Sequence, residues 1–307
     1  MADARPKSGY PRLSVLVPAF NEEDGIASVI ADLQLHLTDF EIIVIDDCST
    51  DKTAERAAAF EGVRVIRLPY NHGYGAALRR GIEAATGDTI AWFDADGEHR
   101  AEDLAAMVLR LNEERLGAVL GARQASVSGS RLAGKLLIRL FAVLLGLGYV
   151  RDFNCGLRLF QRDVIERFLL LLPEGYSAST TSTFLTIRLH IPFRFHPITL
   201  RPRIGESKVR LADGFKTLVT VLRIASLLQP LRLFGAIGSC MAFAGIVYSA
   251  VVMIVNGQGL PVLGGVMLLS AFLIYALAVL ADQLSLLRLQ HSMDVSLTKL
   301  RSRDAHD

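Results

Sequence analysis

The residues best suited to chemistry in this chain are two aspartates, Asp94 and Asp96, which follow a short apolar run. Carboxylate oxygens are the ligands that Mg²⁺ and Mn²⁺ prefer, and these ions bridge the phosphates of nucleotides. A bound cation also neutralises charge on a departing diphosphate. Glu98 follows two residues later and can add a third oxygen. The spacing predicts a divalent metal site at Asp94, Asp96 and Glu98, whereas the same run taken alone would be a solvated acidic loop.

Three earlier motifs also follow apolar runs. Asp46 and Asp47 can accept hydrogen bonds from a base or a ribose. Residues 71–75 contain two glycines ahead of a predicted helix, which lets the backbone approach a phosphate or sugar, although the segment alone would be a tight turn. A dinucleotide-binding fold requires a glycine-rich turn after its first strand. Residues 18–22 contain no glycine, which argues against a dehydrogenase of that kind.

Alternating strands and helices must position these motifs. The expected strands are 13–17, 41–45, 63–68, 89–93 and 118–120, and the expected helices are 22–36, 51–60, 75–85 and 101–112. This alternation predicts an α/β domain with a mostly parallel sheet and helices on both faces. Ligands of such sheets bind beyond the carboxyl ends of the strands. The motifs at Phe20–Glu22, Asp46–Asp47 and Asp94–Asp96 are therefore expected to share one crevice.

Two uncharged stretches, 233–255 and 257–281, are each longer than the roughly 20 residues that span a bilayer. We expect two transmembrane helices, with buried helices of a soluble protein as the alternative. The segment before them has a polar stripe on one helical face, which favours a helix on the membrane surface. The expected domains are a catalytic domain (1–210), an amphipathic interface helix (211–230), a two-helix membrane anchor (231–289) and a cytoplasmic tail (290–307).

Charge is distributed unevenly along the chain. Residues 1–115 contain 12 basic and 21 acidic groups, and the remainder contains 21 basic and 10 acidic groups. A basic half beside membrane spans suggests phosphates or anionic lipid headgroups as partners. No nucleic-acid recognition motif accompanies the charge. Arg232 and Arg288 flank the two spans, and the connector between them is uncharged, which places both ends on the cytoplasmic side of the cell (inner) membrane.

The motifs together resemble a known enzyme family. Pro-Ala-Phe-Asn-Glu, Asp-Asp-Cys-Ser-Thr-Asp, Asn-His-Gly-Tyr-Gly and Asp-Ala-Asp-Gly-Glu-His occur in the order typical of glycosyltransferase family 2, and more narrowly of the polyprenyl- or dolichyl-phosphate hexosyltransferases. The resemblance continues through residues 152–158 and 203–208, and the two spans match the membrane-anchored members. It implies a GT-A fold and transfer of a hexose, with inversion, from a UDP- or GDP-sugar to a polyprenyl phosphate.

The resemblance also implies roles for individual residues. The nucleotide would be held by Pro18, Phe20, Glu22 and Asp46 or Asp47, the metal and diphosphate by Asp94, Asp96 and Glu98, and the lipid phosphate by Arg123 with Arg131 or Lys135. Asp152 matches a proposed catalytic carboxylate, and Arg203 and Lys208 would hold diphosphate or lipid phosphate from a mobile loop. Two segments depart from the family pattern: position 98 is usually Gln, and residues 177–183, commonly acidic, are Ser, Ala and Thr here.

Two other functions share some of these features. A processive polysaccharide synthase would carry a Gln-x-x-Arg-Trp motif, but the only tryptophan is Trp92 in an expected strand. A non-catalytic membrane scaffold would not need the complete set of acidic and basic residues. A monoester phosphate has a second pKa near 6 and is already a nucleophile, so Asp152 either removes a proton or only orients a substrate. The oligomeric state is open, although small two-span proteins often form homo-oligomers.

Overall fold

The computed structural model describes residues 12–123, 150–175, 177–202, 204, 226, 229–257 and 259–304. The chain divides into two compact units, one containing the sheet and the other the long apolar helices. The expected interface helix falls almost wholly outside the described residues. The end expected for the membrane anchor, residue 289, lies inside a helix that continues to Asp304.

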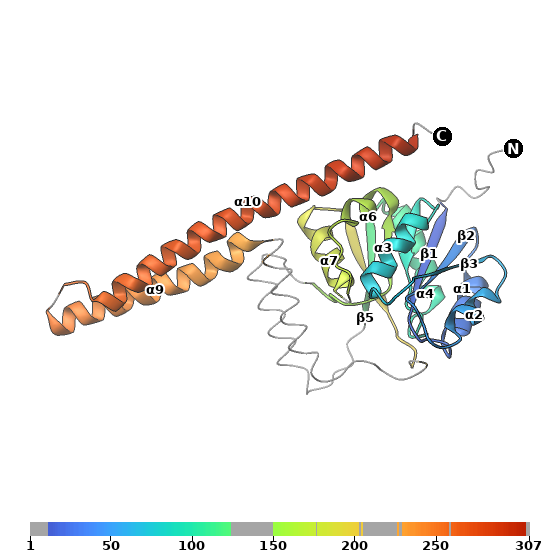
Figure 1. The fold of residues 1–307 in the computed structure, drawn as a ribbon, viewed down its shortest axis with the longest axis horizontal. Helices are drawn as coiled ribbons and strands as arrows, with labels where there is room; N and C mark the ends of the chain where they lie inside the picture. The colour runs from blue at the N-terminus through green and yellow to red at the C-terminus, as the bar shows by residue number, and fades with distance from the viewer. Residues whose placement is uncertain are drawn as a thin grey trace. The chain divides into compact units, whose positions relative to one another are not determined.

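A seven-stranded sheet forms the first unit, in the order β3-β2-β1-β4-β6-β5-β7 (Figure 1). Its strands are β1 (Leu13–Ala19), β2 (Phe40–Asp46), β3 (Val63–Arg67), β4 (Thr89–Trp92), β5 (Ala118–Arg123), β6 (Arg158–Gln161) and β7 (Phe193–Ile198). All pairings are parallel except those of β6, which runs antiparallel to β4 and β5. The carboxyl ends of β1, β2 and β4 thus lie at one edge of the sheet, as expected from the sequence.

Helices cover both faces of the sheet. They are α1 (Ile26–His36), α2 (Thr53–Ala58), α3 (Tyr74–Ala84), α4 (Ala101–Glu113), α6 (Arg162–Phe168) and α7 (Ala178–Arg188). Successive residues of a strand point to opposite faces. Val15 and Val17 accordingly join the core formed with α1 and α4, whereas Leu16 lies against Gly81 of α3.

The expected elements are confirmed up to residue 123, with small shifts at their ends. β1 and β2 continue to Ala19 and Asp46, and α1 begins at Ile26 instead of residue 22. The four elements between residues 158 and 198 were not expected. The sequence patterns of two of them explain why they were missed. α7 is rich in serine and threonine, and β7 is only partly buried and contains Pro197.

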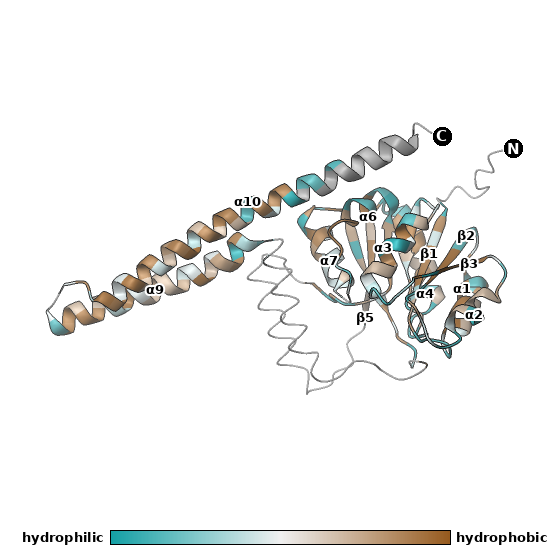
Figure 2. Ribbon diagram, viewed as in Figure 1, coloured by the Kyte–Doolittle hydropathy of each residue, from teal (hydrophilic) through white to brown (hydrophobic). Residues whose placement is uncertain are grey.

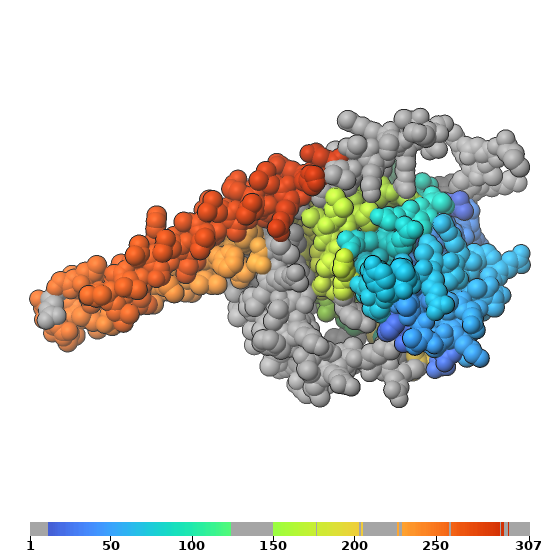
Figure 3. Space-filling view, viewed as in Figure 1, coloured from blue at the N-terminus to red at the C-terminus, as the bar shows by residue number. Residues whose placement is uncertain are grey.

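Two long helices follow, α9 (Pro230–Asn256) and α10 (Val262–Asp304), and the second unit contains α9 and α10 as far as His291. Residues 230–256 and 262–288 are each long and apolar enough to cross a membrane, and Figure 2 shows the apolar stretch of each helix. The helices lie side by side (Figure 3). Gly238 allows this approach, because a Cβ there would lie 3.1 Å from the ring of Tyr275. Many large apolar side chains face outward, including Phe243, Ile254 and Phe272.

The start of α3 fits closely against the loop that precedes α7. A Cβ on Gly75 would lie 1.9 Å from the carbonyl oxygen of Pro173. The Ala76 amide donates to the Glu174 carbonyl at 3.0 Å, and Arg79 pairs with the Glu174 carboxylate at 3.0 Å. The backbones of these two segments therefore meet where no side chain can be accommodated.

We predict that Gly75→Ala destabilises the protein by about 1–3 kcal/mol, the usual cost of overpacking. The measurement is the apparent melting temperature of the detergent-purified protein, which should fall by several degrees. Gly175→Ala is the matched control, because a Cβ on Gly175 would meet nothing within 4 Å. Equal melting temperatures of the two variants would contradict the close approach described here.

Candidate active site

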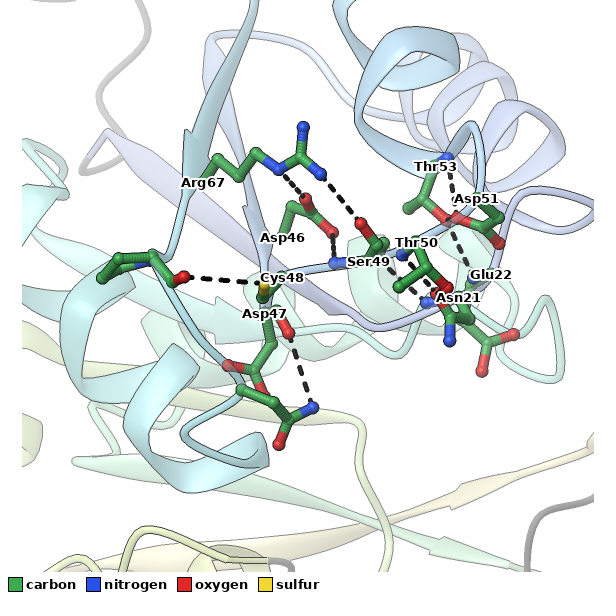
Figure 4. A network of polar contacts seen from close by, with 12 residues as sticks. Asn21, Glu22, Asp46, Asp47, Cys48, Ser49, Thr50, Asp51, Thr53 and Arg67 are labelled. Atoms are coloured by element: carbon green, nitrogen blue, oxygen red, sulfur yellow. Dashed lines mark hydrogen bonds and ion pairs between the residues drawn. The ribbon is translucent and has the colours of Figure 1, made fainter.

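The loops after β1 and β2 are joined by hydrogen bonds into one surface (Figure 4). The Asn21 amide donates to Ser49 Oγ at 2.9 Å, and the Thr50 amide donates to Asn21 Oδ1 at 2.8 Å. The Glu22 amide donates to Thr53 Oγ1 at 2.9 Å. Asn21 has a positive φ of 52°, a conformation that asparagine tolerates better than most residues. Two motifs that are separated in sequence therefore form a continuous loop surface.

Asp46 fixes the ends of β2 and β3 to each other. Its side chain is fully buried, and Oδ1 accepts a hydrogen bond from the Ser49 amide at 3.1 Å. Oδ2 lies 3.2 Å from Nε of Arg67. The same guanidinium donates to the Ser49 carbonyl at 2.8 Å. This carboxylate therefore stabilises the loop that follows β2, and its expected contact with a nucleotide stays a prediction.

Asp47 holds the loop that precedes α3. Its two carboxylate oxygens accept hydrogen bonds from the amides of His72 and Gly73, both at 2.8 Å. Gly73 has a φ of 95°, in the region that favours glycine. Both oxygens of Asp47 thus fix the backbone immediately before Tyr74, the first residue of α3.

Asp94 is held from three sides. The Tyr74 hydroxyl donates to Oδ1 at 2.9 Å, and Nε2 of His99 lies 3.2 Å from Oδ2. On the third side a Cβ on Gly156 would lie 1.8 Å from Oδ2, so only glycine fits there. The Asp94 side chain is still 27% exposed. It is therefore fixed in position and accessible to a ligand.

The surroundings of Asp94 favour its ionised form. Burial alone would raise the pKa of Asp94, but the hydrogen bond and charge of His99, the Tyr74 hydroxyl and the guanidinium of Arg123 together lower it. The pKa of His99 is raised in turn: burial opposes its charge, and the nearby carboxylates, Asp94 first, outweigh burial. A carboxylate that is ionised at neutral pH is what a divalent cation requires.

Asp96 and Glu98 lie on a loop that is bound through its backbone to the segment after β7. The Glu98 amide donates to Asp96 Oδ1 at 3.1 Å. The Arg201 amide donates to the Glu98 carbonyl at 2.8 Å, and the Ile204 amide donates to the Asp96 carbonyl at 3.0 Å. The positions of both carboxylates therefore depend on the backbone of Arg201 and Ile204.

The expected metal site at Asp94, Asp96 and Glu98 stays a prediction. Over the described ranges of the chain, no group of three or more His, Cys, Asp and Glu side chains could hold a metal ion. The oxygens of Asp94 face Tyr74 and His99 instead. Mg²⁺ is usually bound through one or two carboxylates together with substrate phosphates. The residues present thus fit a cation that arrives with a nucleotide better than a resident ion.

Arg123, expected to bind the lipid phosphate, and Asp152, expected to be the catalytic carboxylate, form a bidentate ion pair. Arg123 Nε donates to Asp152 Oδ2 at 2.7 Å, and Nη2 donates to Oδ1 at 2.9 Å. The Asn154 amide adds a bond to Oδ1 at 3.0 Å. Burial would raise the pKa of Asp152, but the hydrogen bonds and charge of Arg123 outweigh burial and lower the pKa. The pair is close enough to Asp94 for Arg123 to influence that carboxylate.

Arg158 lies fully buried behind this pair. Its guanidinium donates four hydrogen bonds, to the carbonyls of Phe153 and Cys155 and to the hydroxyls of Ser182 and Thr183, at 2.7–3.1 Å. Thr180, also on α7, forms a hydrogen bond with Asn154. The Ser/Thr-rich segment that departs from the family pattern is thus the buried N-terminal part of α7, and it provides neutral partners for a buried cation.

Residues 14–169 match the family model described as glycosyl transferase family 2, and residues 229–287 match the model described as the GtrB C-terminal hairpin. The chain belongs to glycosyl transferase family 2. The first match contains the loops after β1, β2 and β4, and the second contains the helical hairpin. The resemblance inferred from the motifs is therefore confirmed.

Relatives and solved structures agree with this assignment. An undecaprenyl-phosphate 4-deoxy-4-formamido-L-arabinose transferase of Klebsiella pneumoniae is 28% identical over 268 residues, which are 80% of this chain and 78% of that protein. A dolichyl-phosphate beta-glucosyltransferase of Dictyostelium discoideum is 30% identical over 210 residues, 59% of this chain and 63% of that protein. A crystal structure of glucosyl-3-phosphoglycerate synthase from Mycobacterium tuberculosis, with Mn²⁺, UDP and glucosyl-3-phosphoglycerate, has a TM-score of 0.59 and 26% identity and covers 73% of this chain and 86% of that chain. The fold is the expected GT-A fold.

Some site residues of this glycosyltransferase were expected and others were not. Pro18 ends up buried within β1, and Phe20 and Glu22 are half-buried in the loop that follows. The expected phosphate-binding residues Arg131, Lys135, Arg203 and Lys208 lie outside the described residues. Sequence reasoning gave no role to Tyr74, His99, Gly156 and Arg158. All four lie inside or directly after the quoted motifs, and this is the signal that could have identified them.

We predict that Arg158→Met lowers stability by about 2–4 kcal/mol, because buried carbonyls left without a donor cost about 1–3 kcal/mol each. The apparent melting temperature of the purified protein measures this loss. Arg79→Met is the control, since Arg79 makes one exposed pair with Glu174 and exposed pairs contribute little. An unchanged melting temperature for Arg158→Met would mean that desolvation of the guanidinium offsets its four hydrogen bonds.

Proposed function

We propose that this protein transfers a hexose from a UDP- or GDP-sugar to a polyprenyl phosphate at the cytoplasmic face of the cell membrane, with inversion at the sugar carbon and with Mg²⁺ or Mn²⁺. The observation that carries the proposal is the bidentate Arg123–Asp152 pair, whose guanidinium also lowers the pKa of Asp94 by its charge; this supports a phosphate-binding role for Arg123 near the expected metal carboxylate. The named acceptors of the relatives and the two apolar helices support a lipid phosphate as acceptor.

The donor would occupy the surface formed by the loops after β1, β2 and β4. Asp94 and Asp96 would hold the cation, which, when bound, offsets negative charge on the leaving diphosphate. Glu22, half-buried at the same edge of the sheet, would contact the nucleoside. The buried carboxylates of Asp46 and Asp47 would support this contact through the loop backbone that they hold. The solved structure with Mn²⁺ and UDP supports this assignment for a protein with the same fold.

The acceptor phosphate would bind by replacing Asp152 on Arg123. The guanidinium presents Nε and Nη2 to two carboxylate oxygens, and the same pair of donors fits two oxygens of a phosphate. A phosphate oxygen then forms a bond to the anomeric carbon while the bond from that carbon to the diphosphate breaks. A dianionic monoester needs no proton removed before it attacks.

The surroundings of Asp152 would change when the acceptor phosphate replaces it on Arg123. While paired, its pKa is held low and it is a weak base. Once Arg123 binds phosphate, the half-buried carboxylate loses that partner, and its pKa rises towards the range set by burial. Asp152 would then accept a hydrogen bond from a hydroxyl of the sugar, or a proton if the phosphate enters as a monoanion. Phosphate binding would thereby make the Asp152 carboxylate a better acceptor of a hydrogen bond or a proton.

The first test uses purified protein in detergent with undecaprenyl phosphate, Mg²⁺ or Mn²⁺, and radiolabelled UDP- and GDP-sugars. Label from one donor should enter the organic phase, and EDTA should abolish this transfer. Asp96→Ala should lower the rate at least about 100-fold, the size expected for loss of charge stabilisation at the leaving group. Asp163→Ala, at an exposed acid of α6 that pairs with Arg167, is the control. Failure of every donor despite nucleotide binding would exclude a polyprenyl phosphate acceptor.

A second test separates the acceptor from the donor. Arg123→Ala should raise the KM for the lipid phosphate about 10- to 100-fold, because charge-assisted hydrogen bonds contribute about 1.5–3 kcal/mol. Nucleotide binding, measured by calorimetry, should stay within about twofold of the parent protein, since Arg123 does not contact the donor in this proposal. An equal loss of both would assign Arg123 to the donor.

A further inference from the structure

The first turn of α1 lies directly behind the loop that carries Asp94 and Asp96. Gly25 precedes α1, and a Cβ there would lie 2.6 Å from the carbonyl oxygen of Ala95. Ala95 is itself buried, with 3% of its surface exposed. The backbone between the two aspartates thus rests on the start of α1 without an intervening side chain.

Further along α1, Asp32 joins two other segments. Oδ2 of Asp32 accepts a hydrogen bond from the amide of Ala101, the first residue of α4, at 2.9 Å. The Arg201 guanidinium donates to Oδ2 at 3.1 Å and to Oδ1 at 3.3 Å. The Asp32 side chain is 14% exposed. One carboxylate therefore binds the start of α4 and a residue that lies after β7.

Arg201 also binds the loop of residues 94–98 through its backbone. Its amide donates to the Glu98 carbonyl at 2.8 Å, and the Ile204 amide donates to the Asp96 carbonyl at 3.0 Å. The Ile204 side chain covers Gly97, where a Cβ would lie 3.0 Å from Cδ1. The loop of residues 94–98 is consequently bounded by α1, by the start of α4 and by Arg201 and Ile204.

We infer that Asp32 and Arg201 are a positioning pair that sets the geometry of the Asp94–Glu98 loop for binding of a divalent cation with a nucleoside diphosphate. The identity of that ligand rests on the proposed function. Neither side chain reaches the ligand-binding edge of the loop by the contacts described, so both act through the backbone at Glu98 and Ala101. Small displacements of ligating groups cost large factors in binding and rate, and so a pair that contributes modestly to stability can matter for function.

The test uses conservative variants of the two charged side chains, and Asp32 also lies 3.4 Å from Nδ1 of His36. Arg201→Gln removes the charge and the bidentate contact, and Asp32→Asn keeps an amide oxygen that can still accept from Ala101. Calorimetry with Mn²⁺ and UDP or GDP should show about threefold to tenfold weaker binding in each variant. The double variant should be no weaker than either single one, because both remove the same interaction. Arg201→Lys should recover part of the loss.

Hydrogen exchange of the ligand-free protein gives a second, independent readout. The amides of Arg201 and Ile204 should exchange about threefold or more faster in Arg201→Gln, because local opening of their bonds to Glu98 and Asp96 becomes easier. Arg80→Gln is the matched control: Arg80 pairs with Glu83 within the exposed face of α3. It should change neither binding nor exchange at these amides.

Three outcomes would overturn the inference: unchanged exchange at both amides, binding of Mn²⁺ and nucleotide equal to the parent, or additive losses in the double variant. If the parent protein binds no nucleotide, the proposed function fails, and hydrogen exchange still decides whether the pair holds the loop. A lower melting temperature with unaltered binding of Mn²⁺ and nucleotide would mean that the pair only stabilises the fold, and this also contradicts the inference.

Discussion

The close approach of backbone segments around the end of β4 is the constraint on which the candidate site depends. Gly25 admits the carbonyl of Ala95, and Gly156 admits the carboxylate of Asp94, in each case at a distance that leaves no space for a Cβ. The loop of residues 94–98 is thus enclosed by chain segments from three distant parts of the sequence. Dense packing of this kind fixes ligating groups in advance of ligand binding. Gly75 likewise admits the carbonyl of Pro173 at the start of α3, where a Cβ would not fit.

Charge is arranged around this enclosed loop in alternating signs. Asp94 and Asp152 carry negative charge, Arg123 pairs with Asp152, and Arg158 lies buried beneath them with hydroxyl and carbonyl partners. Burying an arginine without a direct carboxylate partner is costly. Here the guanidinium is satisfied by four hydrogen bonds and lies within the field of nearby carboxylates. The arrangement holds cationic charge near a place where two phosphate groups would have to meet.

The sequence was sufficient to place Asp46, Asp47, Asp94 and Asp96 at one edge of a sheet, because parallel strands with alternating helices leave their carboxyl ends together. It was not sufficient for the region after residue 150. β6 inserts antiparallel between β4 and β5, a pairing that no local pattern specifies. α7 lacks an apolar stripe because most of its buried positions are Ser or Thr, among them Ser182 and Thr183, which bind Arg158, and Thr180, which binds Asn154.

The sequence also could not predict which residues far apart in the chain contact one another in the site. Asp32 and Arg201 are 169 positions apart, and each alone is an ordinary charged residue. The same holds for Arg123 and Asp152, which were both selected but not as partners. Residue type and spacing identify which groups can do chemistry, whereas the pairs among them follow from the tertiary packing.

The carboxylate of Asp152 would also make Arg123 selective among the phosphates at a membrane. Phospholipid headgroups are phosphodiesters with one negative charge, and they vastly outnumber any single-chain lipid monophosphate. A bare guanidinium at the bilayer would be covered by these abundant diesters. Arg123 instead already has a bidentate anionic partner, so an incoming group must offer more charge than a carboxylate to displace it. A monoester dianion meets that condition and a diester does not, so the ion pair would favour a monoester as the phosphate that Arg123 binds.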